Sequence, residues 1–95
     1  MDKYELVVIV DAANPQETKE SILKETTDVI NKSEGKVINS QVWLEKHKFS
    51  FPMKKRPEGT YYLINFESPR PSVIKIKQFL RQNENILRSL IARVE

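Results

Sequence analysis

Cysteine is absent from the 95 residues, and the chain has only two glycines, one tryptophan and one histidine. Without cysteine there can be no disulfide, thiolate metal site or cysteine nucleophile. Two glycines cannot build the glycine-rich loop that cradles phosphates. No apolar stretch approaches the roughly 18 residues of a membrane span, and the run from Leu6 to Val10 is too short for a secretory signal. We therefore expect a soluble, cytoplasmic protein.

The length of the chain fits one domain, residues 1–95, rather than two. A domain of this size buries only about 60–65% of the surface that its unfolded chain exposes, so its core is modest. Such a core leaves no room for a deep active site with several walls. Although the apolar share is only 39%, the apolar residues are strongly patterned, and this pattern favours a folded domain over disorder.

Charge is unevenly distributed along the chain. Residues 1–45 hold five basic and nine acidic residues, whereas residues 46–95 hold eleven basic and four acidic ones. The first half therefore carries a net charge of −4 and the second half +7, although the whole chain carries only +3. This asymmetry favours an anionic partner for the second half. Chance clustering on a solvated surface is the alternative.

The hydrophobic pattern predicts six elements. Asn14 is expected to cap the first helix, with Pro15 in its first turn and Glu17 at the capping-box position, and Gly35 is a plausible stop. Strands are expected at 4–10, 36–53, 60–67 and 86–94, with one helix between the first two strands and one between the last two. A change of parity predicts a bulge or bend near Glu45 and Lys46, and residues 54–59 are expected to form a polar turn.

The order β-α-β-β-α-β is satisfied by an α+β, ferredoxin-like fold, a four-stranded antiparallel sheet with both helices on one face. Right-handed crossovers place the first and third strands in its centre. The uncovered face should then carry an apolar set that a small monomer gains little by exposing. We interpret that set as a candidate partner-docking surface, and it comprises Val7, Ile9, Tyr61, Leu63 and Leu90. An ordinary wet sheet face is the alternative.

No constellation in the sequence predicts catalysis, a metal site or a cofactor. The single histidine, His47, lies between two lysines and has no convergent ligands at metal-binding spacing. It also lacks the positioned partner that a general base needs. The carboxylates gather on the first helix, interspersed with lysines, which is typical of a solvated helix face.

The basic hairpin is the most distinctive feature of the chain. Phosphates favour lysine and arginine, and aromatic faces accept unstacked bases. Six basic residues flank Phe49, Phe51 and Tyr61 here, namely Lys46, His47, Lys48, Lys54, Lys55 and Arg56. Three further arginines are candidates for a second strip of phosphate contacts, namely Arg81, Arg88 and Arg93. Solubilisation of an edge strand by lysine is the alternative to RNA contact.

Four segments together resemble the bacterial small-subunit ribosomal protein six family. They are Tyr-Glu-Leu at 4–6, Phe-Ser-Phe-Pro-Met-Lys-Lys at 49–55, Gly-Thr-Tyr-Tyr-Leu-Ile-Asn-Phe-Glu at 59–67 and Asn-Glu-Asn-Ile-Leu-Arg at 83–88. In the family, the second and third correspond to a central block with lysine and to a Gly-x-Tyr strand. The resemblance runs essentially from residue 3 to residue 95.

This resemblance implies a ferredoxin-like fold in the small ribosomal subunit and no catalysis. It implies binding to small-subunit (16S) ribosomal RNA together with ribosomal protein eighteen of the small subunit. Tyr4, Lys55, Arg81 and Arg88 match family positions that we link to RNA or partner contact, so Tyr4 joins the expected docking set. No membrane, small-molecule substrate or cofactor is implied.

Two other functions stay open at this point. The first is a small enzyme of the acylphosphatase type on the same fold, which would need an Arg and an Asn converging on a loop after the first strand. Residues 11–14, Asp-Ala-Ala-Asn, supply neither a basic residue nor a glycine there. The second is a regulatory dimerisation module that uses the apolar open face.

Overall fold

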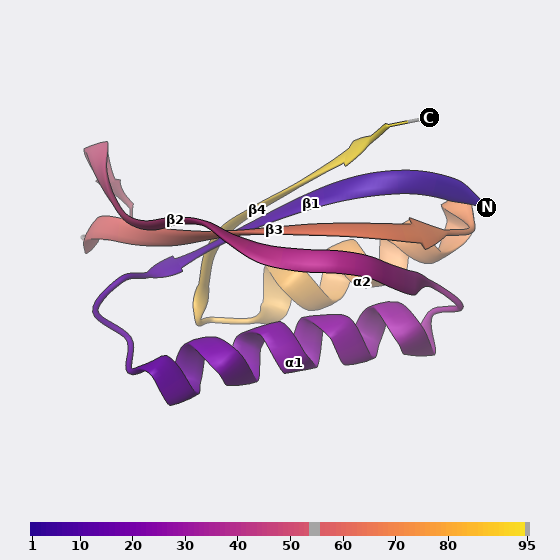
Figure 1. Cartoon of the computed structure of the whole chain (residues 1–95), viewed down its shortest axis with the longest axis horizontal. Coiled ribbons are helices and arrows are strands. Elements are labelled where there is room, and N and C mark those ends of the chain that lie inside the picture. The colour runs from indigo at the N-terminus through magenta and orange to yellow at the C-terminus, as the bar shows by residue number, and fades with distance from the viewer. Residues whose placement is uncertain (54–55, 95) are drawn as a thin grey trace.

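Six elements form the protein in the expected order. The computed structural model describes residues 1–53 and 56–94. The strands are β1 (Asp2–Asp11), β2 (Lys36–Met53), β3 (Arg56–Ser68) and β4 (Ile86–Arg93), and the helices are α1 (Gln16–Lys32) and α2 (Arg70–Gln82). Figure 1 shows both helices on one side of a twisted sheet, with the two chain ends at the same end of the molecule. The ferredoxin-like architecture predicted from the sequence is thus confirmed.

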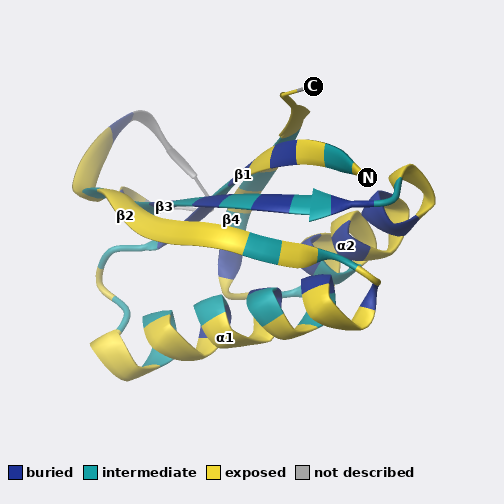
Figure 2. Cartoon of the chain, turned by 45° about the vertical axis from the view of Figure 1, so that its right-hand side comes forward, coloured by how far each residue is buried: buried dark blue, intermediate teal, exposed yellow. Residues whose placement is uncertain are grey.

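The strands run in the spatial order β2-β3-β1-β4, and every neighbouring pair is antiparallel. This order puts β1 and β3 in the centre, as predicted, and leaves β2 and β4 as the outer strands. In Figure 2 the outer strand β2 is largely exposed, whereas the central strand β3 alternates between buried and half-buried residues from Thr60 onward.

Side-chain alternation assigns one face of the sheet to the core. Leu6, Val8 and Val10 of β1 are fully buried, and their register partners on β3 include Ile64 and Tyr62. The helices close this core with one buried stripe each, Ile22, Thr26 and Ile30 from α1 and Val73, Ile76 and Leu80 from α2. Successive strand residues point to opposite faces, so the residues between these positions lie on the side that no helix covers.

The strand β2 is irregular, and one irregularity lies where the sequence predicted it. Leu44 pairs with Tyr61 and His47 pairs with Gly59, so Glu45 and Lys46 together face the single residue Thr60. The Thr60 hydroxyl donates to the Glu45 carbonyl oxygen at 2.6 Å and so fastens the bulge. The bulge predicted near these two residues is confirmed.

Two local predictions are wrong. The capping position of α1 is Pro15 rather than Asn14, and no side-chain hydrogen bond caps the helix there. The segment 56–59 was expected to belong to a polar turn, but β3 already begins at Arg56, because Glu58 and Gly59 pair with Lys48 and His47 across the hairpin. Lys54 and Lys55, also in that expected turn, lie outside the described residues.

The end of α1 depends on Gly35 for space rather than for backbone freedom. The helix ends at Lys32, and Glu34 takes the left-handed conformation (φ 66°) that glycine usually supplies. The Gly35 N–H then donates to the Ile30 carbonyl oxygen at 2.9 Å. A Cβ on Gly35 would lie 2.7 Å from Cγ2 and 2.8 Å from the carbonyl oxygen of Ile30, closer than real Cβ contacts allow.

An ion pair joins the start of β1 to the start of α2. The Arg70 Nε donates to Asp2 Oδ2 at 2.6 Å, and this hydrogen bond lowers the pKa of Asp2 below its ordinary value. Both side chains are reached by solvent, so the pair orients the helix start more than it stabilises the fold.

Replacement of Gly35 by alanine should destabilise the protein by about 1–3 kcal/mol, because the added methyl group overpacks the turn against Ile30. The neighbouring Glu34→Gly variant is the matched control. It removes a side chain from a left-handed residue, so its change should stay within about 1 kcal/mol and lie on the stabilising side. Urea denaturation followed by circular dichroism measures both. Equal stability of Gly35→Ala and the unaltered protein would contradict this account of the turn.

Candidate RNA and partner interface

The open face of the sheet, opposite the helices, carries an apolar strip across its middle. Val7 of β1 pairs with Leu63 of β3 on one side and with Leu90 of β4 on the other. These three residues share the parity that points away from the helix-side core. Leu90 is 51% exposed, whereas Val7 and Leu63 are half-buried. The structure therefore leaves a continuous apolar strip on the surface.

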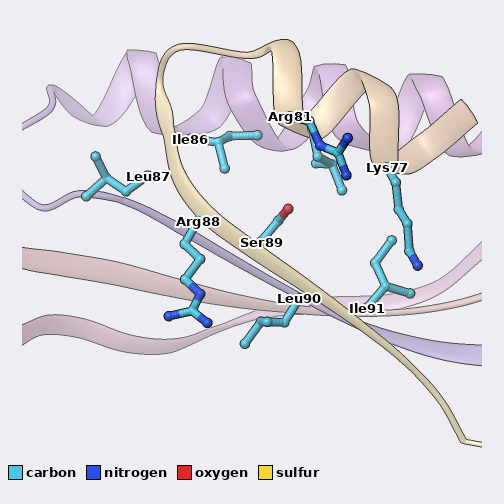
Figure 3. A pocket seen from close by; sticks show the side chains of 9 residues that line it. Lys77, Arg81, Ile86, Leu87, Arg88, Ser89, Leu90 and Ile91 are labelled. Carbon is cyan, nitrogen blue, oxygen red and sulfur yellow. The ribbon is translucent and has the colours of Figure 1, made fainter. Parts of the chain in front are cut away.

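The next row of the open face combines apolar, aromatic and basic groups. Ile9 of β1 pairs with Tyr61 on β3 and with Arg88 on β4. Arg88 is exposed and its side chain lies on the side of β4 away from α2 (Figure 3). The five residues expected on the open face thus lie there in two adjacent rows, and Arg88 borders them.

An aromatic cluster surrounds Tyr61 at this end of the open face. The rings of Trp43 and His47 meet Tyr61 edge to face, with centroids 6.0 and 5.3 Å away. The Phe49 ring lies 6.3 Å from Tyr61 in a tilted arrangement. Edge-to-face and offset contacts at such distances are favourable, so the cluster is held by its own rings. Trp43 is 54% exposed and His47 is also exposed, whereas Tyr61 is half-buried and Phe49 is buried.

Phe49 covers part of the open face because Gly59 makes room for it. The ring of Phe49 and Cγ2 of Ile9 both lie where a Cβ on Gly59 would stand. As a result Ile9 is only 3% exposed although no helix covers it. The hairpin formed by β2 and β3 therefore shields one end of the face and leaves the Val7 strip uncovered.

The opposite end of the open face is polar. Glu5 of β1 pairs with Asn65 of β3, and the Asn65 Nδ2 donates to Asn39 Oδ1 of β2 at 2.8 Å. The face therefore changes along the strands from aromatic and basic through apolar to polar and acidic.

The structure separates the residues that the sequence predicted as RNA contacts. Lys46, His47 and Lys48 are exposed at the aromatic end, on the strand that carries Trp43. Arg88 lies in the row of Ile9 and Tyr61 at the same end. Lys54 and Lys55 lie outside the described residues, and Arg56 is described as the first residue of β3.

Two of the predicted arginines lie elsewhere. Arg81 is in the last turn of α2, on the helix side of the sheet. Arg93 pairs with Tyr4 near the chain start, and its positive charge helps to lower the pKa of Asp2. Arg93 lies five positions after Arg88, about 17 Å along the strand. The nine residues therefore do not form one continuous patch.

Tyr4 lies apart from the other residues of the expected docking set. Its side chain is 6% exposed, belongs to the helix-side core and stacks on Phe66 with ring centroids 5.4 Å apart. It therefore supports the sheet from within and offers a partner almost no surface.

Trp43 belongs to the aromatic cluster and was not assigned to a site from the sequence. Trp43 continues the alternating positions of Asn39 and Gln41. A single aromatic residue at an otherwise polar set of positions was the only feature of the sequence that could have marked it as a site residue. The register shift between Val42 and Leu44 sets its position beside Tyr61, and no pattern in the sequence reveals that shift.

The loop after β1 does not have the chemistry of a phosphate-binding enzyme site. The backbone N–H groups of Ala12, Ala13 and Asn14 already donate to the Glu58 carbonyl, Asp11 Oδ1 and the Asp11 carbonyl. The neighbouring cavity of about 180 Å³ contains the carboxylates of Asp11 and Glu58 beside Lys46, and carboxylates repel an anion. Residues 1–53 and 56–94 also contain no cluster of side chains that could hold a metal ion.

Burial of the Tyr62 phenol in the core raises its pKa, and the charges of Glu20 and Glu45 act in the same direction. Tyr62 therefore stays neutral and supplies no reactive group. Within the described part of the chain, no helix is long and apolar enough to cross a membrane.

Comparison with known proteins identifies the family. The family model described as Ribosomal protein S6 matches residues 3–93. Small ribosomal subunit protein bS6 of Micrococcus luteus is 34% identical over 95 residues, which cover 100% of this chain and 93% of that protein. The Clostridioides difficile protein of the same name is 34% identical over 91 residues, 96% of this chain and 97% of that protein.

A solved structure agrees with the sequence matches. The crystal structure of 30S ribosomal protein S6 from Thermotoga maritima superimposes with a TM-score of 0.89 at 25% identity, and the match covers 97% of this chain and 86% of that one. The resemblance inferred from the four sequence segments is confirmed. The family is one of structural proteins rather than enzymes, so the acylphosphatase alternative is wrong. The chain, which carries an apolar strip, an aromatic cluster and Arg88 on the open face of a four-stranded sheet, belongs to the ribosomal protein S6 family.

Proposed function

We propose that this protein is an RNA-binding brace of the small ribosomal subunit, which binds 16S ribosomal RNA together with ribosomal protein eighteen (S18). The observation that carries the proposal is the open face, where an uncovered apolar strip adjoins an aromatic and basic end. Family membership makes the chain a structural component of the small subunit, located in the ribosome in the cytoplasm.

RNA contact is assigned to the aromatic end of the open face. Arg88 is exposed there on the open face, and Lys46 and Lys48 are exposed at the same end of β2 on the opposite parity. All three can neutralise phosphates. The exposed ring of Trp43 beside Tyr61 can accept an unstacked base, as aromatic side chains do in RNA-binding proteins. Because these cations are few, the free protein should bind RNA weakly and depend on a second protein for affinity.

Protein docking is assigned to the apolar strip of Val7, Leu63 and Leu90. A small monomer gains nothing by exposing Leu90, and burial of such a side chain contributes about 1.5–3 kcal/mol to association. Because the strip adjoins the residues assigned to RNA contact, a partner docked on it would lie beside the RNA, as a ribosomal protein does. The choice of S18 rests on the family resemblance.

Loss of two cations at the aromatic end should weaken RNA binding and reduce its salt dependence. In the Lys46→Gln/Lys48→Gln variant, each lost phosphate contact should reduce the slope of log K against log salt by about 0.7–0.9. The control variant, Lys24→Gln/Lys75→Gln, removes the same charge from exposed helix positions and should keep the slope. A filter-binding series with 16S ribosomal RNA and S18 measures the slopes. Equal slopes for the two variants would contradict the assignment.

Disruption of the apolar strip should weaken partner binding without unfolding the protein. Leu90→Asp should lower the affinity for S18 by about tenfold to a hundredfold, the range expected from losing a buried leucine. The matched control is Ile74→Asp on α2, since Ile74 is 62% exposed but lies on a helix. Trp43, the only tryptophan, reports binding through its fluorescence. Equal affinities of the two variants would contradict the docking site, and a stable homodimer through this face would favour the dimerisation alternative.

A further inference from the structure

The outer edge of β4 differs from the open face and from the other outer strand. β4 pairs only with β1, so its second edge has no partner strand within the described residues. The other outer strand, β2, is interrupted by four register shifts along its pairing with β3. The β1–β4 ladder, by contrast, is regular from Tyr4 paired with Arg93 to Ile9 paired with Arg88. Bulges protect an edge from pairing with another chain, so β4 is the edge without this protection.

The backbone groups that β4 directs outward can be identified. The Val94 N–H donates to the Lys3 carbonyl at 2.8 Å, so Val94 and Lys3 form a hydrogen-bonded pair of the antiparallel ladder. Hydrogen-bonded and non-hydrogen-bonded pairs alternate along antiparallel strands. The next hydrogen-bonded positions on β4 are therefore Ala92 and Leu90, whose backbone groups point toward β1. The N–H and C=O groups of Ser89 and Ile91 therefore point to the unpaired edge.

A groove of about 540 Å³ runs beside this edge, between β4 and α2. Figure 3 shows Lys77 and Arg81 extending from α2 toward the strand, with Ser89 and Ile91 on the helix side and Arg88 on the other. Lys77 and Arg81 are four residues apart and so share a helix face. The groove is lined by these three cations with serine and aliphatic residues, and it contains no acidic side chain.

We propose that the β4 edge binds an extended, acidic segment of another protein, which adds to the sheet as a further strand. Its backbone would pair with Ser89 and Ile91, in the manner of strand addition at other exposed sheet edges. Its side chains would alternate, with carboxylates on one side meeting Lys77 and Arg81. On its other side, an acidic residue would meet Arg88 and an apolar one would meet Leu90.

Charge selects this occupant over the alternatives. A second copy of the chain would pair β4 with β4, and this strand carries Arg88 and Arg93 with no acidic residue. Like charges would then face each other, which disfavours self-association. RNA would satisfy the cations but could not continue the ladder of backbone bonds. The proposed surface shares Leu90 with the apolar strip and Arg88 with the aromatic end. Its outward backbone groups and the cations Lys77 and Arg81 lie outside both, so the proposal does not rest on the docking of S18.

A short peptide of alternating glutamate and valine tests the proposal on the full-length protein. Binding followed by NMR should slow the exchange of the Ser89 and Ile91 amide protons and leave the Leu90 amide, already bonded to β1, unchanged. The Lys77→Glu/Arg81→Glu variant should bind the peptide at least about tenfold more weakly, because two attractive pairs become repulsive. The Lys75→Glu/Lys24→Glu variant carries the same charge change outside the groove and should bind nearly as well as the unaltered protein.

Three results would overturn the proposal. Absence of peptide binding would do so, as would binding with no protection of Ser89 and Ile91. The third result concerns a single-stranded RNA. If the RNA and the peptide bound the groove equally, if the Lys77→Glu/Arg81→Glu variant bound neither, and if the two amides stayed unprotected, the groove would be assigned to nucleic acid. Because Leu90 belongs to both surfaces, these outcomes are judged on Ser89, Ile91, Lys77 and Arg81, none of which belongs to the apolar strip. The docking of S18 is measured separately with Leu90→Asp.

Discussion

Two helices can cover only one face of a four-stranded sheet, and the organisation of this protein follows from that limit. Strand alternation sends half of the side chains to each face, so Leu6 and Val8 enter the helix-side core while Val7 and Ile9 face the other way. The chain nevertheless places apolar residues at both parities of β1 and β3. The apolar groups of the open face must therefore be covered by the hairpin, by another molecule, or by both.

The hairpin covers one end of that face, and the remainder matches a surface for partners. Phe49 reaches over Gly59 and buries Ile9, so the aromatic end is organised before any partner arrives. The Val7 strip next to it has no such cover, and the Asn39–Asn65 pair marks the polar end. A brace between RNA and protein benefits from this order, because its cations, rings and apolar strip hold fixed positions on one rigid sheet.

Much of this could be predicted from the sequence, because alternation and helical stripes are local. The element order, the central position of β1 and β3, the bulge near Glu45 and the residues of the open face all follow from such patterns. Features set by tertiary packing could not be predicted. The aromatic cluster depends on the register shift beside Trp43, and Glu34 rather than glycine takes the left-handed turn because Gly35 is needed against Ile30.

The central claim is that the uncovered sheet face is an interface, and hydroxyl-radical footprinting tests it most directly. The reactivity of the Leu90 and Trp43 side chains, both about half exposed, would be compared between the free protein and small subunits purified from cells. The account predicts that both residues react readily in the free protein and are strongly protected in the subunit. Equal reactivity of both residues in the two states would contradict it.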